Sequence, residues 1–439
     1  MAKLRGGMEF QHGRPIHLPS PPKVLPAQPI RLTCSVRPEV AAGQPVEPGQ
    51  VLAAPTDPAL ACTVCPVDGK IKQIDAWNDG RRYDVTIDPS GRTITTTLPT
   101  ETPRTRTLEN WYTALRRLGP WLDGPEHLSL IRQLAAAQHR RPDTLICIGL
   151  DTFPPYPDSS SLLLSFPDDT VLGTQILADV VGAENVIMLA PASAVVTGRV
   201  RSSCKNFRMP LAVVRNVYPS ADPTMVAWLH TPGRRYLHRS ANPVDQRVVL
   251  IRPWTAIRLA RWFTQRELDL SRPMMLAWPE PGAPLTPTYA LAGQPLASLH
   301  GTLGGSAAAL AGRVVAGNPM TGRPIVTPPS DDQGLDPVVP ADELLLSVLG
   351  TAAAHKPEPC IHCGWCAQVC PTQLQPIHLA ELCHTTTTRH DAHLKRHLPW
   401  CIDCGLCSHV CPSNLPLAQT LRAAAQQLEI TSPPEAAAK

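Results

Sequence analysis

The sequence is poor in aromatic and charged residues, and it contains no long apolar run. Of its 439 residues, 5% are aromatic and 17% are charged, and the net charge of +4 is too small to indicate a partner that is a nucleic acid. The longest nearly apolar stretch, Leu344 to Ala354, is interrupted by Ser347, Gly350 and Thr351 and is too short to span a membrane. The opening MAKLRGGMEF lacks the apolar core of a signal peptide, so we expect a cytoplasmic protein.

Proline and cysteine, by contrast, are abundant. The 50 prolines predict short helices and many connections. Eight of the 14 cysteines fall in two runs near the C-terminal end, PCIHCGWCAQVCP and WCIDCGLCSHVCP. Each run has the spacing C-x2-C-x2-C-x3-C-P, which is the pattern of proteins that hold two iron–sulfur clusters.

The spacing also predicts which cysteines share a cluster. Three thiolates two residues apart hold one [4Fe-4S] cluster, and the fourth, before the proline, ligates the other cluster. The first predicted set is therefore Cys360, Cys363, Cys366 and Cys411, and the second is Cys370, Cys401, Cys404 and Cys407. Gly364 and Gly405 lie inside the loops, where the backbone must approach a cluster, while Pro371 and Pro412 end them.

Two other interpretations of the cysteine runs are weaker. A structural zinc site also uses C-x2-C pairs, but zinc takes four ligands and has no need of either longer run. A disulfide framework would require export, for which the chain carries no signal.

The first hundred residues predict an extended segment followed by a small β module. Residues 1–29 are rich in proline and are expected to lie over another surface. Residues 30–100 contain AAGQPVEPGQVL and PVDGKIKQI, with Gly43, Gly49 and Gly69 expected at turns. The pattern resembles the barrel-sandwich (hammerhead) fold of biotinyl and lipoyl carriers, but TDPALACTVCP between its halves lacks the carrier lysine.

Cys62 and Cys65 form an isolated C-x2-C pair within this module. One hypothesis is a third metal or redox site that also uses Cys34. We favour the alternative of two small thiols without a ligand, because one pair supplies too few donors for a metal.

The rest of the chain divides into four parts and a tail. Residues 101–271 alternate helical patterns with buried strands such as DTLICIGL, NVIMLA and RVVLIRP, which predicts a mostly parallel α/β sheet. Residues 272–328 predict a small β module, 329–341 a linker, and 342–430 a helical domain that contains both cysteine runs. Residues 431–439 form a tail. His384, His390, His393 and His397 lie around the helix predicted between the two runs, and the last three could share one face. One hypothesis is a metal site, and we favour the alternative of a solvated polar face.

Taken in order, these segments resemble the C subunit of the Rnf-type (Rsx-type) ion-translocating electron transport complex. The resemblance covers nearly the whole chain, and the matching stretches include QHGRPIHLPSPPK, PVDGKIKQI, PDTLICIGLDTFPPYP, NVYPSADPTMV, VVAGNPMTG and CPSNLPLAQ. It implies a domain like the NADH- and FMN-binding subunit of respiratory complex I, a small β module of the soluble-ligand-binding (SLBB-like) type, and a helical two-cluster ferredoxin domain. It also implies a peripheral position on the cytoplasmic face of the cell membrane against partner subunits.

The sequence departs from this family where FMN and NADH would bind. The flavin-cradling loop is replaced by RRLGPWLDGPEHLSL, in which Gly119 and Gly124 are the only glycines. Backbone amides approach a phosphate closely where glycine removes the side chain, so Pro120 and Trp121 are poor substitutes. The acidic loop has become DTFPPYPD, and a glycine pair and an acid-lysine pair are replaced by Ala221, Asp222, Pro223 and Thr224. We therefore expect that FMN and NADH binding is lost.

Two functions remain. The first is an electron-transfer subunit of a membrane-bound redox complex, in which electrons enter from another subunit, a ferredoxin or a flavodoxin. The second is a scaffold whose clusters serve folding. We favour electron transfer, because eight cysteines in the two-cluster arrangement are more than a metal site that only stabilises the fold requires.

Overall fold

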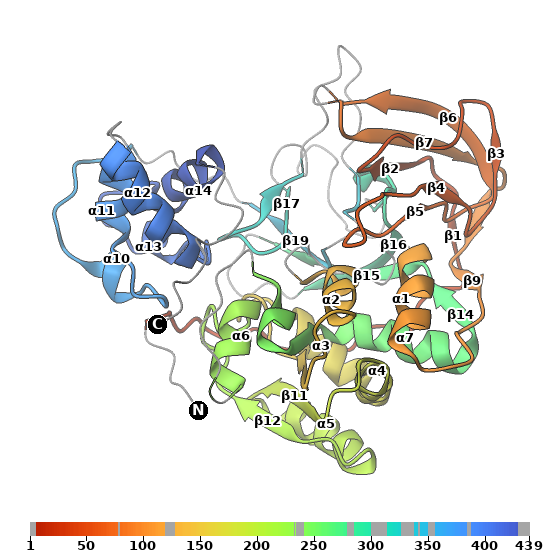
Figure 1. Ribbon diagram of the computed structural model, residues 1–439, viewed down its shortest axis with the longest axis horizontal. Coiled ribbons are helices and arrows are strands. Elements are labelled where there is room, and N and C mark those ends of the chain that lie inside the picture. Colours follow the sequence, from red (N-terminus) through yellow and green to blue (C-terminus); the bar gives the residue numbers. More distant parts are fainter. Residues whose placement is uncertain are drawn as a thin grey trace.

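The computed structural model describes residues 6–77, 80–118, 128–231, 233, 241–278, 285–299, 314–325, 338–340, 343–349, 356–383 and 388–428. Within these ranges the chain forms a β module, a parallel α/β domain, a mixed five-stranded sheet and a helical cysteine domain (Figure 1). The described helices include none that is long and apolar enough to cross a membrane.

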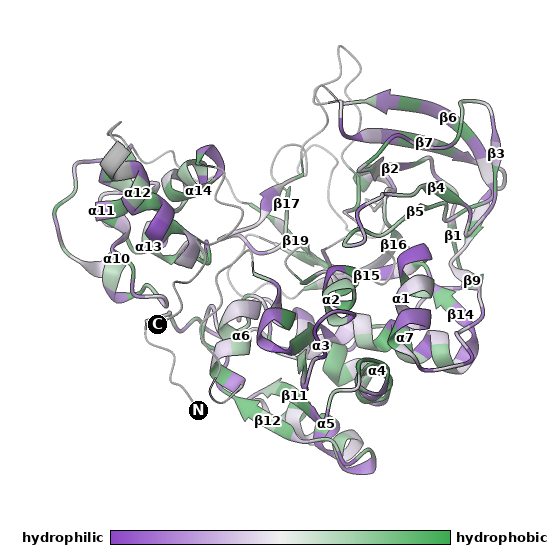
Figure 2. Cartoon of the chain, in the orientation of Figure 1, coloured by the Kyte–Doolittle hydropathy of each residue, from purple (hydrophilic) through white to green (hydrophobic). Residues whose placement is uncertain are grey.

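The β module is built on an antiparallel sheet. Its order is β2 (Ile30–Cys34), β7 (Tyr83–Pro89), β6 (Gly69–Ala76) and β3 (Pro45–Val46), and β4 (Val51–Ala53) pairs separately with β5 (Thr63–Val64). Polar and apolar residues alternate along β6 and β7, which leaves one face of the sheet for the core (Figure 2).

Two of the three expected turn glycines lie in turns. Gly43 and Gly49 have φ of +86° and +85°, a backbone conformation that favours glycine. Gly69 instead begins strand β6, where a Cβ atom would lie 2.5 Å from the carbonyl oxygen of Asp88. The prediction of a turn at Gly69 was therefore wrong, and the position needs glycine for close contact between strands.

The N-terminal segment is extended, but part of it belongs to the β module. β1 (Val24–Pro26) pairs with β8 (Thr93–Thr95), so the boundary drawn after residue 29 falls too late. β9 (Thr97–Pro99) pairs with β14 (Glu267–Asp269) and joins the module to the α/β domain. Proline is tolerated at the end of an edge strand, as at Pro26, but the proline-rich sequence gave no sign that a strand lies here.

The α/β domain contains the expected parallel sheet. Its order is β12 (Leu211–Val214), β11 (Asn185–Pro191), β10 (Thr144–Ile148) and β13 (Val248–Ile251), and all three pairings are parallel. Both faces are buried, because Leu145 and Cys147 enter one core whereas Ile146 and Ile148 enter another. This two-sided burial explains the continuous apolar runs in the sequence.

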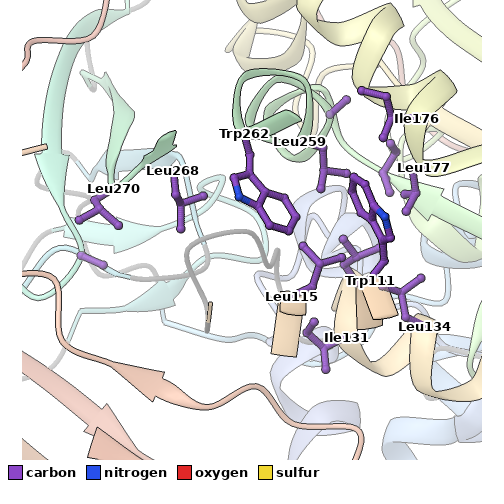
Figure 3. Close-up of a cluster of buried hydrophobic side chains, with 14 of the residues drawn as sticks. Trp111, Leu115, Ile131, Leu134, Ile176, Leu177, Leu259, Trp262, Leu268 and Leu270 are labelled. Carbon is purple, nitrogen blue, oxygen red and sulfur yellow. The ribbon is translucent and has the colours of Figure 1, made fainter. Parts of the chain in front are cut away.

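Helices cover both faces of this sheet. Residues of α1 (Leu108–Arg117), α2 (Leu130–Ala137), α4 (Pro167–Val181), α5 (Ala194–Asn206) and α7 (Pro253–Gln265) enter the larger core, while residues of α6 (Pro223–His230) enter the smaller one and η3 (Pro243–Gln246) lies beside α2, α6 and β13. In the larger core, Trp111 of α1 and Trp262 of α7 meet edge to face at 5.3 Å between ring centroids (Figure 3). α3 (Asp158–Ser165) lies against α5 and α7.

The second sheet has five strands in the order β16 (Thr286–Leu291), β15 (Ser271–Ala277), β19 (Leu345–Val348), β17 (Val314–Ala316) and β18 (Arg323–Pro324), with η4 (Leu296–Leu299) at its side. β19 pairs with both β15 and β17, so its residues belong to this sheet. The boundary at residue 342 was therefore too early, because β19 follows the predicted linker and still belongs to the five-stranded sheet.

The cysteine domain, described over residues 356–383 and 388–428, consists of short helices joined by loops. It contains α10 (Trp365–Gln368), α11 (Pro376–Cys383), α12 (Thr388–His397), η5 (Leu398–Trp400), α13 (Leu406–His409) and α14 (Leu417–Gln427). Its core gathers Leu379, Leu394, Leu398, Leu417 and Leu421. This domain stands beside the α/β domain, at the left of Figure 1.

Candidate functional site

The two cysteine runs fold as two copies of one loop. Residues with a left-handed backbone recur at equivalent positions of the runs, in the pairs His362 and Asp403, Gly364 and Gly405, and Gln373 and Asn414. The φ angles of the two glycines are +78° and +79°. Short helices follow both glycines, α10 in the first run and α13 in the second.

The hydrogen bonds of the two loops repeat as well. The amides of Ala367 and Ser408 each donate, over 3.1 Å, to the carbonyl of the glycine that precedes the short helix. Farther on, the amides of Gln373 and Asn414 donate over 3.1 Å to the carbonyls of Cys370 and Cys411, respectively. The equal spacing of the cysteines in sequence is thus translated into equal backbone geometry.

One set of cysteines gathers between the two loops. Burial raises the pKa of the Cys404 thiol well above its usual value, and the neighbouring thiols of Cys401, Cys407 and Cys370 raise it further. Burial followed by Cys401 and Cys370 also raises the pKa of Cys407 to about 12. Cys370 from the first run therefore joins three cysteines of the second run.

Cys411 of the second run likewise lies near cysteines of the first run. Burial raises the pKa of Cys366, and the thiols of Cys363 and Cys411 are among the groups that raise it further. Two hydrogen bonds bring the chain before Cys360 to the turn after Cys411: Glu358 N donates to Ser413 O over 2.9 Å, and Ser413 Oγ donates to Pro359 O over 2.9 Å. Cys411 therefore lies near two cysteines of the first run, and the assignment of the eight cysteines to two cluster sets stays a prediction.

Backbone amides point at three of the sulfur atoms. His362 N, Leu374 N and Asp403 N each donate over 3.4 Å to the Sγ of Cys360, Cys370 and Cys401, respectively. Such bonds stabilise a thiolate, and in iron–sulfur proteins hydrogen bonds to sulfur help set the reduction potential.

The predicted donor sets have the chemistry of iron–sulfur ligands. Neighbouring thiols with raised pKa values, such as Cys404 and Cys407, ionise together only when positive charge lies among them, and cluster iron would supply that charge. Among the residues that the structure describes, no group of three or more histidine, cysteine, aspartate or glutamate side chains is arranged to hold a metal ion.

The second cysteine set lies against the carboxyl end of the parallel sheet. Tyr218, which follows β12, donates from Oη to the carbonyl of Cys404 over 2.6 Å. Leu406 packs with Tyr218 and with Phe153, which follows β10. Ile402 packs with residues of α6 in a second small core. The sequence did not predict these contacts. Two of the five phenylalanines and two of the six tyrosines belong to the small core around Leu406.

The N-terminal segment ties these parts together. Gly7 N donates to Val369 O over 2.8 Å, and Met8 exchanges hydrogen bonds with Tyr218 at 2.9 and 3.1 Å. The ring of Phe10 lies 4.9 Å from that of Phe153. Farther on, Gly13 N donates to the carbonyl of Pro154 over 2.9 Å, and a Cβ at Gly13 would lie 2.1 Å from Pro155 O.

The acidic residues after β10 are bonded within their own loop. Asp151 accepts hydrogen bonds from Ser160 N at 2.8 Å and Ser160 Oγ at 2.5 Å, while Asp158 accepts from Thr152 N and Oγ1 at 3.1 and 3.0 Å. Burial, and then the charge of Asp158, raises the pKa of Asp151 well above its ordinary value. Both carboxyl groups therefore stabilise the loop that the N-terminal segment covers.

The remaining departures from the family pattern have different outcomes. Asp222 is the N-cap of α6 and accepts from Thr224 N at 2.9 Å, so its role is structural. Gly119, Pro120, Trp121 and Gly124 lie outside the described residues.

A cavity of about 600 Å³ lies at the opposite end of the sheet, where β10 and β11 begin. Its lining includes Asp143, Glu184, Arg208 and His230. The Nδ1 atom of His230 is buried without a partner, and burial lowers the pKa of this histidine. Parallel α/β sheets bind ligands beyond the carboxyl ends of their strands, which is the other edge.

The cysteines of the β module are buried. Cys34 and Cys65 each have a pKa raised to about 11, mainly by burial, and Cys65 Sγ donates to Val67 O over 3.1 Å. Cys62 is 5% exposed. Burial and the raised pKa make the thiols of Cys34 and Cys65 poor nucleophiles, and the role of the Cys62 and Cys65 pair stays a prediction.

The predicted histidine face is only partly visible. The rings of His393 and His397 lie 4.3 Å apart, and His378 of α11 lies 5.7 Å from His393. His384 and the side chain of His390 lie outside the described residues. The grouping with His378 arises from packing between α11 and α12, which helical periodicity alone does not reveal.

No family model and no curated protein matches this chain. Similar solved structures include the NAD+-reducing [NiFe]-hydrogenase in the air-oxidised state, with a TM-score of 0.42, 14% identity and coverage of 73% of this chain and 62% of that chain. For the same hydrogenase in the H2-reduced state, the TM-score is 0.44 and the sequence identity is 13%, with coverage of 76% of this chain and 64% of that chain. The chain thus spans less than two thirds of those chains. At these TM-scores the likeness leaves the family open, and the cysteine geometry carries the functional argument.

Proposed function

We propose that this protein relays single electrons through two [4Fe-4S] clusters. The observation that supports the proposal is that Cys411 lies near Cys363 and Cys366 of the first run, while Cys370 lies near Cys404 and Cys407 of the second. If each loop gives its fourth cysteine to the other set, the two clusters are neighbours, and short separation is what electron transfer between them requires. When bound, each cluster supplies a one-electron redox couple.

The chain's own residues hold and tune these clusters. The eight cysteines provide the thiolates, and the amides of His362, Leu374 and Asp403 donate to three of the sulfurs. Arg422 braces the second loop by donating twice to Asp403, at 2.7 and 3.1 Å. The pKa of Arg422 is raised by these bonds, so the guanidinium stays charged beside the second set.

The family resemblance extends the proposal to a larger assembly. We infer a peripheral subunit of an Rnf-type ion-translocating oxidoreductase, held on the cytoplasmic face of the cell membrane by partner subunits. Electrons enter from another subunit, a ferredoxin or a flavodoxin. The near-complete match of the two cysteine runs and of CPSNLPLAQ to the family form supports this assignment.

FMN and NADH are not part of the proposed function. The loop after β10 is bonded to itself through Asp151 and Asp158, and the N-terminal segment lies over it. A flavin or a dinucleotide would have to displace that segment from the edge where such ligands bind. Acid extraction of the purified protein is expected to release no stoichiometric flavin; a yellow extract with one flavin per chain would contradict this part.

The central experiment compares two cysteine variants. Purified wild type is expected to contain about eight irons per chain and, after reduction, to show two interacting EPR signals. Cys404→Ala should lose the signal of the second cluster and keep that of the first. Cys383→Ala is the matched control, because Cys383 lies in the same domain, outside the runs, and its thiol bonds to Leu379 O at 3.1 Å. Zinc or an absence of iron in the wild type would overturn the proposal.

A scaffold with structural clusters is the alternative, and assembly separates it from a relay. In cells, the amount of assembled complex and the electron flux through it are measured for Cys404→Ala. A relay predicts that flux is lost in complexes that still assemble. Normal flux without the second cluster would leave only the scaffold.

A further inference from the structure

The two loop copies differ in what covers them. In the second loop, Ile402 and Leu406 are 6% and 0% exposed. Ile402 packs with Met225 and Leu229 of α6, and Leu406 packs with Phe153 and Tyr218. The α/β domain therefore caps this loop with an apolar, partly aromatic surface.

The equivalent residues of the first loop are uncovered. Ile361 stands where the second loop has Ile402, and it is 66% exposed; Trp365 stands where that loop has Leu406, and it is 50% exposed. Cys363 between them is also exposed, whereas its counterpart Cys404 is partly buried. Because the backbone is the same in both loops, the difference lies only in the missing cover.

The composition of the first loop indicates which kind of partner fits. From Pro359 to Ala380 the sequence contains no aspartate, glutamate, lysine or arginine. Mobile electron carriers are steered by complementary charge, and their association falls steeply with salt. Lasting complexes instead bury apolar surface, as the second loop does inside this chain.

We propose that Ile361, Cys363 and Trp365 form the docking surface for a resident protein partner that carries its own redox centre beneath an uncharged apolar face. This inference rests on the proposed electron relay, and it assigns the exchange of electrons with the partner to the first cysteine set. The second set lies against the α/β domain.

The test uses the full chain expressed with a tag in its native host. Membranes and cytosol are solubilised together in mild detergent at high salt and separated on a native gel. Wild type is expected in a complex that contains a second polypeptide with its own redox spectrum. Ile361→Asp and the milder Ile361→Thr, which keeps the branched shape, should shift most of the chain to the monomer. Val195→Asp is the matched control at 64% exposure, and it should remain in the complex.

Iron content and the reduced EPR spectrum of each form separate the two proposals. Monomeric Ile361→Thr with both clusters intact supports the docking surface. Docking is overturned if the wild type is monomeric, if its complex holds only copies of this chain, or if both Ile361 variants stay in the complex. Absence of clusters from the wild type would overturn the electron relay itself.

Discussion

The hydroxyl of Tyr218 offers a direct test of how the α/β domain holds the second cysteine loop. Tyr218 is 3% exposed, and its Oη donates to Cys404 O over 2.6 Å. Burial raises its pKa well above the usual value, so the hydroxyl stays protonated and remains a donor. Tyr218→Phe keeps the ring against Phe153 and removes the hydroxyl with its hydrogen bond to Cys404.

The expected cost follows from the buried carbonyl that is left behind. An unsatisfied buried acceptor costs about 1–3 kcal/mol, whereas the ring contacts are unchanged. Local opening of the contact should therefore become about 5-fold to 150-fold more frequent. Hydrogen exchange of the amides in residues 401–407 measures this directly, and the reduced EPR signal of the second cluster should broaden as its loop loosens.

The matched control is Tyr289→Phe. Tyr289 is 8% exposed and donates to Pro19 O over 2.7 Å, far from the cysteines in sequence. Its loss should cost stability of the same order and leave both cluster signals unchanged. Unaltered exchange and an unaltered spectrum in Tyr218→Phe would refute the reasoning that this hydroxyl fixes the loop, as would an equal spectral change in the control.

Three further predictions concern packing, backbone conformation and pH. Gly173→Ala should lower the melting temperature strongly, because its Cβ would lie 1.8 Å from the carbonyl oxygen of Ala256, and helices α4 and α7 would have to separate. Gly405→Ala should destabilise the holoprotein more than Gly364→Ala in thermal unfolding: both have positive φ, but a Cβ meets a backbone oxygen at 2.8 Å only at Gly405, with nothing within 4 Å at Gly364. Asp151 has a raised pKa in the folded state, so its contribution to stability is complete below the ordinary carboxyl pKa and is lost as pH rises through the folded value. Asp151→Asn should flatten this decline in urea unfolding measured from acidic to neutral pH, and an unchanged slope would contradict the assignment.

Local sequence accounted for much of the fold. Buried strands such as Thr144–Ile148 were predictable because a parallel sheet is buried on both faces and needs continuous apolar runs. The strands β1 and β19 were not, because each pairs with residues far away in the sequence, and short segments carry little local signal. The close approach at Gly69 escaped prediction for the same reason, since glycine in a strand and glycine in a turn look alike in one sequence.

The sequence by itself determined the cysteine spacing from which the cluster chemistry is predicted, because ligand spacing within a loop is a local property of the chain. It also determined the pseudo-repeat of the two loops, through glycine and proline at matching positions. Only the tertiary structure decided which loop is covered and which is open. Ile361 and Ile402 are identical residues in equivalent loops, yet one is 66% and the other 6% exposed, because burial depends on what the rest of the chain places beside them.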